Sequence, residues 1–283
     1  MFESSVRIQM TTKPTKKNSS PKPQSPVATR RFEGKVAVIT GASVRGIGGA
    51  IAKRLSDEGA SLALLSRSTP DALIEQLRGQ STNVVWNACD IADGDSIADA
   101  TEVCLREFGE IDVLVNNAGI QSAGPFVEMD EKDWRRVLEV NLLGVLKMSQ
   151  TLLPHLQRKK GVIVNVSSAT ALAGTSGLAA YGAAKAGLNG LTETLAVEVA
   201  PQKVRVVGVA PALVRTPMVL PCLEHVTAEN WEAIQKSHPL GIGTPEDVAA
   251  AVAFLASSEA RWISGVTLPL GWMPIWPLPP LKS

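Results

Sequence analysis

The stretch Thr40-Gly41-Ala42-Ser43-Val44-Arg45-Gly46-Ile47-Gly48 is the part of the chain that decides the fold. It follows a short aliphatic run, Val36–Thr40, and leads into a segment of helical periodicity, Gly48–Glu58. Glycines between a strand and a helix let a phosphate approach backbone N–H groups and the positive end of the helix dipole. Tight turns use glycine as well, but this position after the first strand favours a dinucleotide-binding loop.

From Lys35 onward, short aliphatic runs alternate with longer segments of helical periodicity. The expected strands are Val36–Thr40, Leu62–Ser66, Val84–Ala88, Val113–Asn116, Val162–Val166, Val204–Ala210 and Val266–Leu270. The expected helices are Gly48–Glu58, Asp71–Arg78, Asp95–Phe108, Glu131–Leu153, Ala179–Val199 and Pro245–Ser257, with Thr244 as the N-cap of the last. This alternation predicts an α/β protein, a single Rossmann-type doubly wound domain whose seven-stranded parallel sheet is flanked by helices.

Composition excludes several classes of function. The chain has 283 residues and a formal net charge of +1, which argues against general nucleic-acid binding. No apolar run reaches the roughly 18–20 residues of a membrane span. The cysteines show no Cys-x-x-Cys spacing and the histidines no ligand motif, so we expect no disulfide framework and no metal site. A reducing compartment, the cytoplasm, is therefore expected.

The two ends of the chain differ from its centre. Residues 1–30 are rich in Ser, Thr, Pro and Lys, with Glu3 as the one acid, and are expected to form a disordered basic tail. Such a composition is compatible with an organelle transit peptide, but prolines such as Pro14 interrupt any amphipathic helix and favour a plain extension. Residues 31–271 are the expected catalytic domain, and residues 272–283 a Pro- and Trp-rich tail.

The end of the second expected strand bears on the choice of cofactor. It reads Leu64-Leu65-Ser66-Arg67-Ser68 and contains no acid that could bind the ribose hydroxyls of NAD. Arg67 could pair with a 2′-phosphate, with the neighbouring serines as additional donors. Arg45 in the glycine loop is close enough in sequence to help. We therefore expect NADP(H) to be preferred over NAD(H), unless both arginines are merely surface charges.

Tyr181 and Lys185 lie four residues apart and would share one face of a helix. A phenol has an ordinary pKa of about 10, and a nearby cation is expected to lower it. The pair therefore predicts a general acid for carbonyl reduction, or a general base for alcohol oxidation. Ser168, after the fifth expected strand, could hydrogen-bond the substrate oxygen. Asn141 either satisfies backbone groups within its helix or holds a water for a proton relay.

In their order and spacing these motifs resemble those of the short-chain dehydrogenase/reductase family, over about residues 33–271. The resemblance implies a catalytic tetrad of Asn141, Ser168, Tyr181 and Lys185. It implies cofactor contacts from Gly41, Ser43, Arg45, Gly46, Ile47, Gly48, Ser66, Arg67, Asp90, Ile91, Asn117, Ala118, Gly119, Tyr181, Lys185, Pro211, Val214 and Thr216. In this pattern Asp90 would bond the adenine edge, and Lys185 would also hold the nicotinamide ribose.

Three features depart from the family pattern. Four residues rather than three separate the first two glycines of the loop, which puts the position of Arg45 in question. Where family members usually have Pro-Gly, this chain has Pro211-Ala212. Where the last strand of family members commonly ends in Asp-Gly-Gly, this chain has a segment that ends in Gly271-Trp272.

Within the family the chain is most similar to bacterial 3-oxoacyl-[acyl-carrier-protein] reductases, on the stretch His238–Gly265. The resemblance implies a ketone or acyl-thioester substrate. An acidic acyl carrier protein is a possible partner, meeting the basic cluster Arg158, Lys159, Lys160 and Lys203, unless that cluster is simply solvated. It also implies a homo-oligomer, a tetramer or dimer, through Glu131–Leu153 and Ala179–Val199. Two alternatives stay open: a sugar or polyol dehydrogenase, and a non-catalytic dinucleotide-binding regulator. The complete tetrad favours an enzyme.

Overall fold

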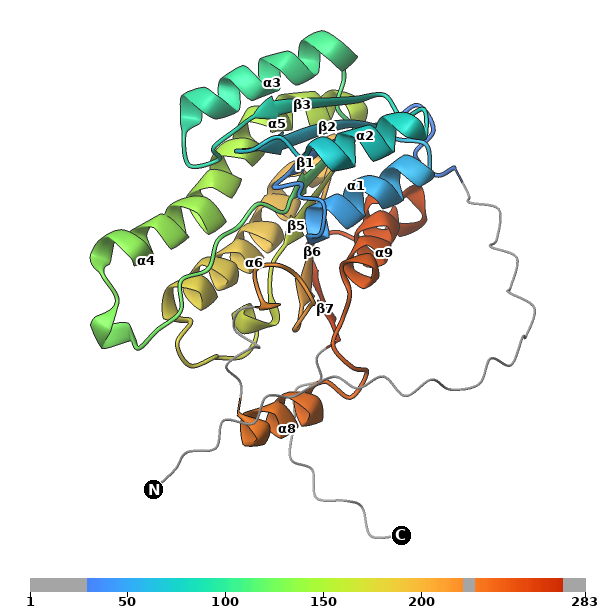
Figure 1. Cartoon of the computed structure of the whole chain (residues 1–283). Coiled ribbons are helices and arrows are strands. Elements are labelled where there is room, and N and C mark those ends of the chain that lie inside the picture. The colour runs from blue at the N-terminus through green and yellow to red at the C-terminus, as the bar shows by residue number, and fades with distance from the viewer. Residues whose placement is uncertain (1–29, 221–226, 272–283) are drawn as a thin grey trace, which may run out of the picture.

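A fully parallel seven-stranded sheet forms the centre of the computed structural model, which describes residues 30–220 and 227–271 (Figure 1). The strands are β1 Val36–Thr40, β2 Ser61–Ser66, β3 Val84–Ala88, β4 Val113–Asn116, β5 Val162–Val166, β6 Arg205–Pro211 and β7 Thr267–Leu270. Their order is β3-β2-β1-β4-β5-β6-β7. The predicted fold is thus confirmed, and the order reverses between β1 and β4, where open α/β sheets bind their ligands.

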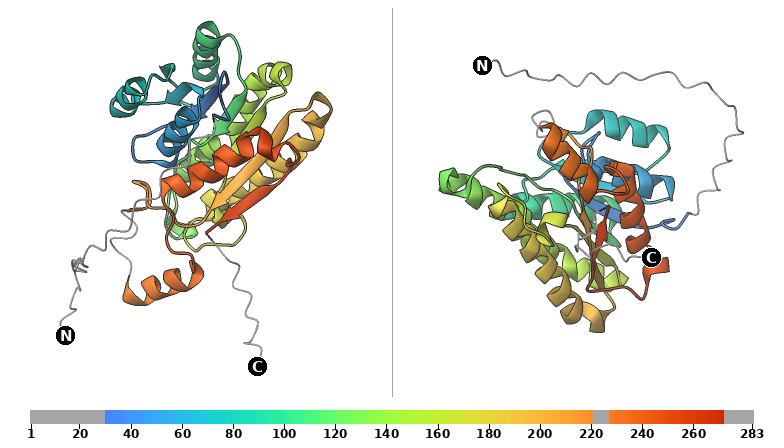
Figure 2. Two further views of the ribbon diagram at one scale, coloured as in Figure 1. Left: turned by 90° about the vertical axis from the view of Figure 1, so that its right-hand side faces the viewer. Right: turned by 90° about the horizontal axis from the view of Figure 1, so that it is seen from below.

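Helices cover both faces of this sheet (Figures 1 and 2). They are α1 Ile47–Asp57, α2 Asp71–Gly79, α3 Gly94–Phe108, α4 Glu131–Leu138, α5 Gly144–Lys159, α6 Ala179–Val199, α8 Ala228–Ser237 and α9 Pro245–Ala256. Apolar residues of α1, α2 and α9 join one core, and those of α3, α5 and α6 join a second core across the sheet. Helix α8 lies outside these two layers (Figure 2).

The inner strands β1, β2, β4, β5 and β6 are mostly aliphatic because each of them serves both cores. In β1, Ala37 and Ile39 belong to the core beneath α1 and α9, whereas Val38 between them belongs to the core beneath α3 and α5. Successive side chains of a strand point to opposite faces, so a strand that is covered twice has no polar side. This double burial explains why continuous aliphatic runs predicted the sheet.

The long helix expected at Glu131–Leu153 differs from the prediction in two ways. A π-helical turn, Glu139–Leu143, separates α4 from α5, and α5 continues past Pro154 to Lys159. Hydrophobic periodicity does not reveal a π turn, because a single turn of five residues is too short to show a period of its own. The turn contains Asn141, one of the predicted catalytic residues.

Helix α8 was not predicted. Its sequence, Ala228–Ser237, contains only Trp231 and Ile234 as large apolar residues, which is too weak a pattern to indicate a helix. The predicted N-cap of α9 is confirmed, since the Thr244 side chain and Asp247 form a capping box. The expected tails at residues 1–29 and 272–283 lie outside the described residues. Within the described ranges, no helix is long and apolar enough to cross a membrane.

Candidate active site

A cavity of about 820 Å³ opens at the carboxyl ends of the strands. The segments that follow β1, β2, β3, β4, β5 and β6 all contribute to its wall, and so does α8. All predicted site residues line this cavity except Arg45, Gly48 and Asn141. The parallel sheet explains the convergence, because the carboxyl ends of parallel strands meet at one edge.

The glycine loop packs directly against the end of β4. A Cβ atom on Gly41 would lie 2.6 Å from Ala118 Cα, and one on Gly48 would lie 2.5 Å from Asn117 Nδ2. Gly41 also has a φ of +71°, a conformation that favours glycine. Gly48 does not line the cavity, but it lets the loop pack closely against Asn117. These glycines form a cradle that side chains would fill.

The extra residue of the glycine loop is accommodated on its outer side. Val44 and Arg45 are exposed, and the Gly46 N–H closes the turn by donating to Ser43 O at 3.2 Å. Arg45 does not line the cavity, whereas Ser43, Gly46 and Ile47 do. Helix α1 begins at Ile47 without a side-chain cap. Its first N–H groups thus remain available for a pyrophosphate.

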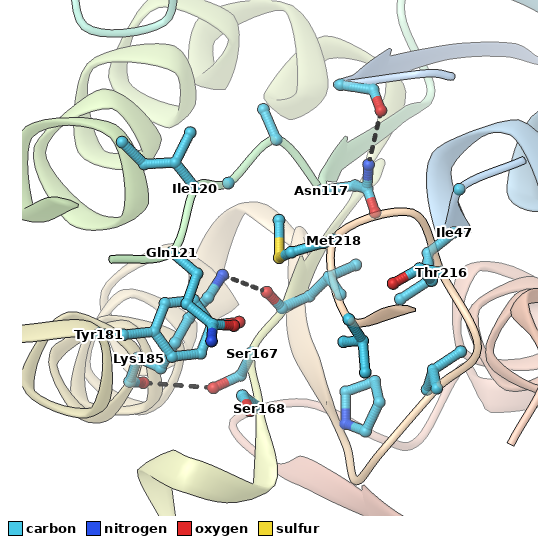
Figure 3. A pocket seen from close by; sticks show the side chains of 18 of the residues that line it. Ile47, Asn117, Ile120, Gln121, Ser167, Ser168, Tyr181, Lys185, Thr216 and Met218 are labelled. Atoms are coloured by element: carbon cyan, nitrogen blue, oxygen red, sulfur yellow. Dashed lines mark hydrogen bonds between the residues drawn. The ribbon is translucent and has the colours of Figure 1, made fainter. Parts of the chain in front are cut away.

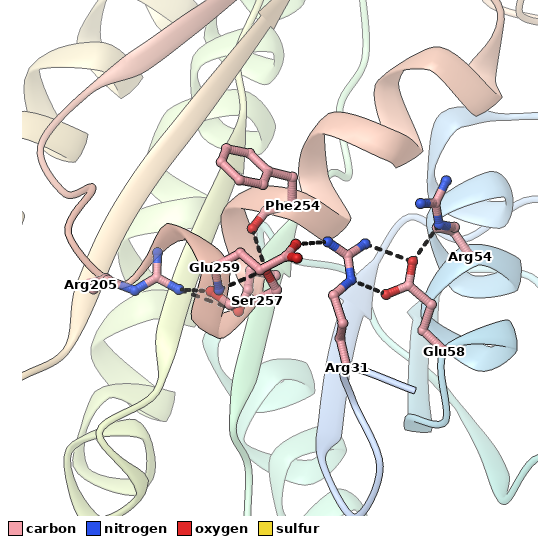
Figure 4. A network of polar contacts seen from close by, with 8 residues as sticks. Arg31, Arg54, Glu58, Arg205, Phe254, Ser257 and Glu259 are labelled. Atoms are coloured by element: carbon pink, nitrogen blue, oxygen red, sulfur yellow. Dashed lines mark hydrogen bonds and ion pairs between the residues drawn. The ribbon is translucent and has the colours of Figure 1, made fainter. Parts of the chain in front are cut away.

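Asn117 ties the end of β4 to the end of β1. Its backbone N–H and that of Ala118 both donate to Thr40 Oγ1 at 3.0 Å, and its amide donates to Thr40 O and Gly41 O at 3.0 and 3.1 Å. The side chain of Asn117 is therefore engaged in holding the glycine loop (Figure 3).

The cavity wall beyond the second strand carries positive charge. Arg67 is exposed, lines the cavity and forms no ion pair within the described ranges. Asp90 accepts a hydrogen bond from Arg136 at 2.6 Å. Burial raises the pKa of Asp90, but the Ala92 N–H, the Arg136 guanidinium and the charge of Arg67 outweigh it, and the pKa is lowered. Arg136 belongs to α4 and was missed, because nothing in the sequence places it beside Asp90.

Asn141 uses its side chain to hold the loop after β4. Its Nδ2 donates to Ile120 O and Val137 O, both at 2.8 Å, and its Oδ1 accepts from the Ile120 N–H at 3.3 Å. The residue is fully buried. Of the two roles considered for it, the structure thus shows its amide satisfying backbone groups.

Ser168, Tyr181 and Lys185 meet at the carboxyl end of β5 (Figure 3). The Ser168 hydroxyl accepts from the Thr170 N–H at 3.2 Å, and it also bonds the Tyr181 phenol. Helix α6 supplies the other two residues. It is anchored to β5 by the Ser167 hydroxyl, which donates to Lys185 O at 3.2 Å.

Lys185 is only 3% exposed, and its ammonium donates to Val166 O at 2.8 Å. Burial lowers the pKa of Lys185 to about 8. Burial also raises the pKa of the Tyr181 phenol, and the hydrogen bond with Ser168 offsets part of that rise. The expected lowering by Lys185 is not found, because its Nζ lies 5.7 Å from the centroid of the phenol ring and faces a carbonyl.

The wall opposite Tyr181 comes from the loop after β6 and from α8. Pro211, Val214 and Thr216 line the cavity as expected. His238 joins this loop to α8: its Nε2 accepts from the Leu213 N–H at 3.1 Å, and its Nδ1 lies 2.8 Å from Ile234 O. These partners place the single ring proton on Nδ1.

Further lining residues were not predicted: Ile120, Gln121, Ala173, Thr175, Leu178, Met218, Val219, Ile234, Ser237 and His238. They come from four segments of the sequence: the loop after β4, the segment before α6, the loop after β6, and α8 with the residue that follows it. Ordinary loop and helix residues of this kind carry no signal that could have marked them.

The basic cluster proposed for a carrier protein lies at the other edge of the sheet. Lys160 directly precedes β5, and Lys203 directly precedes β6, so both lie at the amino ends of strands. Lys159 pairs with Glu110 at 2.5 Å. The cluster therefore does not line the cavity of its own chain, and its role as a docking site for an acyl carrier protein stays a prediction.

Comparison with known proteins agrees with this site. Residues 35–226 match the family described as short chain dehydrogenase. The chain is 39% identical to the 3-oxoacyl-[acyl-carrier-protein] reductase FabG of Thermotoga maritima, over 83% of this chain and 95% of the relative. It is 38% identical to dehydrogenase/reductase SDR family member 4 of Caenorhabditis elegans, over 85% and 95%.

A solved structure has the same fold. It is that of a protein assigned to the short-chain dehydrogenase/reductases of Burkholderia xenovorans, with a TM-score of 0.80 and 34% identity, over 85% of this chain and 96% of that one. The chain belongs to the short-chain dehydrogenase/reductase family. It is accordingly an NAD(P)-dependent oxidoreductase, and the cradle at the start of α1 fits the pyrophosphate of such a dinucleotide.

Because the ammonium of Lys185 is buried, we expect its removal to stabilise the fold. Lys185→Met should stabilise the fold at pH 7 by about 1–2 kcal/mol, because the pKa of Lys185 is lowered and burying its charged form is unfavourable. The folded state binds fewer protons than the unfolded state between pH about 8 and 10.5, so the gain should shrink as the pH rises through that window. Chemical denaturation at several pH values measures it. Lys147→Met, at an exposed position, is the control, and equal behaviour of both variants would contradict the prediction.

Proposed function

We propose that the chain is an NADP(H)-dependent reductase that converts a ketone, such as a 3-oxoacyl thioester, into a secondary alcohol, or catalyses the reverse reaction. The observation that carries this proposal is the meeting of Ser168, Tyr181 and Lys185 at one point of the cavity. The resemblance to 3-oxoacyl-[acyl-carrier-protein] reductases supports a thioester substrate. A dinucleotide-binding regulator would not need a phenol and an ammonium at this position.

When bound, the cofactor supplies or accepts a hydride. Negative charge then grows on the carbonyl oxygen during reduction, and the Ser168 hydroxyl is placed to donate a hydrogen bond to it. Burial keeps the Tyr181 phenol protonated at neutral pH, which is the form a general acid needs. Lys185 has a pKa of about 8 and so gains and loses a proton near neutral pH. It could therefore offset a change in the charge of the nearby phenol.

Substrate enters at the carboxyl edge of the sheet in this proposal. Gln121, Met218 and Ile234 border the cavity near Tyr181 and would contact the part of the substrate beyond its carbonyl. An acyl carrier protein that delivers its thioester to this cavity would have to dock at the same edge. A sugar or polyol would meet a mostly apolar wall there, which favours a ketone or thioester.

Tyr181→Phe should abolish most of the chemistry while leaving cofactor binding intact. The change removes the proton donor and keeps the ring, so turnover should fall by about a hundredfold or more. NADPH oxidation with acetoacetyl thioesters and simple ketones measures turnover, and fluorescence titration measures cofactor affinity. Full carbonyl reduction by a folded Tyr181→Phe protein would refute the assignment of Tyr181 as the proton donor. It would also reopen the hypothesis of a non-catalytic dinucleotide-binding regulator.

NADP(H) preference is assigned to Arg67 in this proposal. Arg67→Asp should reverse the preference, because a carboxylate repels a 2′-phosphate and can bind ribose hydroxyls. Arg45→Asp is the matched control, since Arg45 is exposed and does not line the cavity. Direct titration of NADPH and NADH should therefore show a large effect for the first variant and a small one for the second. Equal affinities for both cofactors in the unmodified protein would defeat the proposal.

We also infer a cytoplasmic homo-oligomer, a tetramer or a dimer. Cys89 and Cys104 are buried free thiols, as expected in a reducing compartment. The helical surface around α4, α5 and α6 carries exposed Leu143 and Leu146, which a second copy would cover. Light scattering at micromolar concentration should give a multiple of the chain mass, and a monomer would contradict the inference.

A further inference from the structure

The hydroxyl of Ser66 is already engaged within the protein. Its Oγ donates to Ser68 O at 2.9 Å and accepts a hydrogen bond from the Trp86 indole N–H, also at 2.9 Å. A serine hydroxyl has a single hydrogen to donate. In this arrangement Ser66 has none left for a ligand in the cavity, although it lines the wall.

The sheet register explains how Trp86 reaches Ser66. Trp86 on β3 lies beside Leu64 on β2, and Leu64 and Ser66 point to the same face because side chains alternate along a strand. The indole ring packs against the core beneath α2, which fixes its position. Its polar N–H edge is thereby directed at the end of β2, as expected for a half-buried tryptophan that needs a partner.

The contact between Ser66 and Ser68 spans Arg67. It closes a short turn around the one residue whose guanidinium lines the cavity without an ion pair in the described ranges. Among the residues that the structure describes, no hydrogen bond holds the Arg67 side chain, so the backbone of this turn sets the position from which the side chain extends. Restricting a binding group before the ligand arrives reduces the entropy that binding must overcome.

We propose that Trp86 and Ser66 are positioning residues for cofactor selection: the indole orients the Ser66 hydroxyl, the hydroxyl closes the turn, and the turn presents Arg67 and Ser68 to the 2′-phosphate of NADP(H). Ser66 then supports the phosphate site without binding the phosphate. This inference rests on the NADP(H) preference proposed above. It differs from the expectation that Ser66 is itself a phosphate donor.

The test is the ratio of NADH to NADPH dissociation constants in the full chain. Trp86→Phe keeps a ring in the core and removes the N–H, whereas Ser66→Ala removes the hydroxyl. Each should lower the ratio by about three- to tenfold, the effect of one hydrogen bond, through weaker NADPH binding alone. The double variant should be no worse than Ser66→Ala, because both changes break the same chain of contacts. Trp262→Phe, at a side chain that is 92% exposed, is the matched control and should leave the ratio unchanged.

Three results would overturn the inference. A lower ratio in Ser66→Ala with an unchanged ratio in Trp86→Phe would mean that Ser66 binds the phosphate directly. If Trp86→Phe weakened the binding of NADH and NADPH equally, Trp86 would serve only core packing. A ratio near one in the unmodified chain would overturn the NADP(H) proposal itself, and it would be seen before any variant is made. Should Trp86→Phe not fold, Ser66→Ala combined with Arg67→Ala and Ser68→Ala decides the matter: a loss larger than that of Arg67→Ala with Ser68→Ala contradicts positioning through these two residues.

Discussion

The hydrogen bonds between Thr40 and the Asn117–Ala118 segment hold together the two strands at which the sheet changes direction. The chain leaves β1 to one side and β4 to the other, so a crevice forms between the loops that follow them. Gly41 lies so close to Ala118 that a side chain would not fit. The depth of the crevice, the course of the glycine loop and the free start of α1 all depend on this close contact.

Two of the predicted catalytic residues lie at positions that depart from what stability alone would favour. Asn141 lies in a π-helical turn, and Lys185 carries its ammonium in a place where burial lowers its pKa to about 8. A regular helix and an apolar side chain would be more stable at these two positions. The surrounding aliphatic cores supply the stability that tolerates both departures.

The sequence predicted most of the fold because strands covered on both faces must be aliphatic, and glycine loops and caps are local. It also predicted that Ser168, Tyr181 and Lys185 lie together, because their proximity depends on spacing along one helix and one strand end. It could not reveal Arg136 beside Asp90, or the indole of Trp86 at Ser66, because these contacts depend on helix packing and sheet register. The sign of the Tyr181 pKa shift was wrong for the same reason: four residues along a helix place Lys185 near the ring but not at its oxygen.

The same distinction, between what the sheet determines and what loops and helices add, divides the cavity into two halves. The half of the cavity in which the cofactor is proposed to bind is formed by strand ends, whose positions the sheet determines. The other half comes from the loop after β4, the segment before α6, and α8, which is joined to the rest through contacts such as that between His238 and Leu213. Changes in these segments alter the wall without disturbing the sheet. Substrate choice can therefore change while hydride chemistry is retained, and the substrate of this chain has to be sought in that half of the cavity.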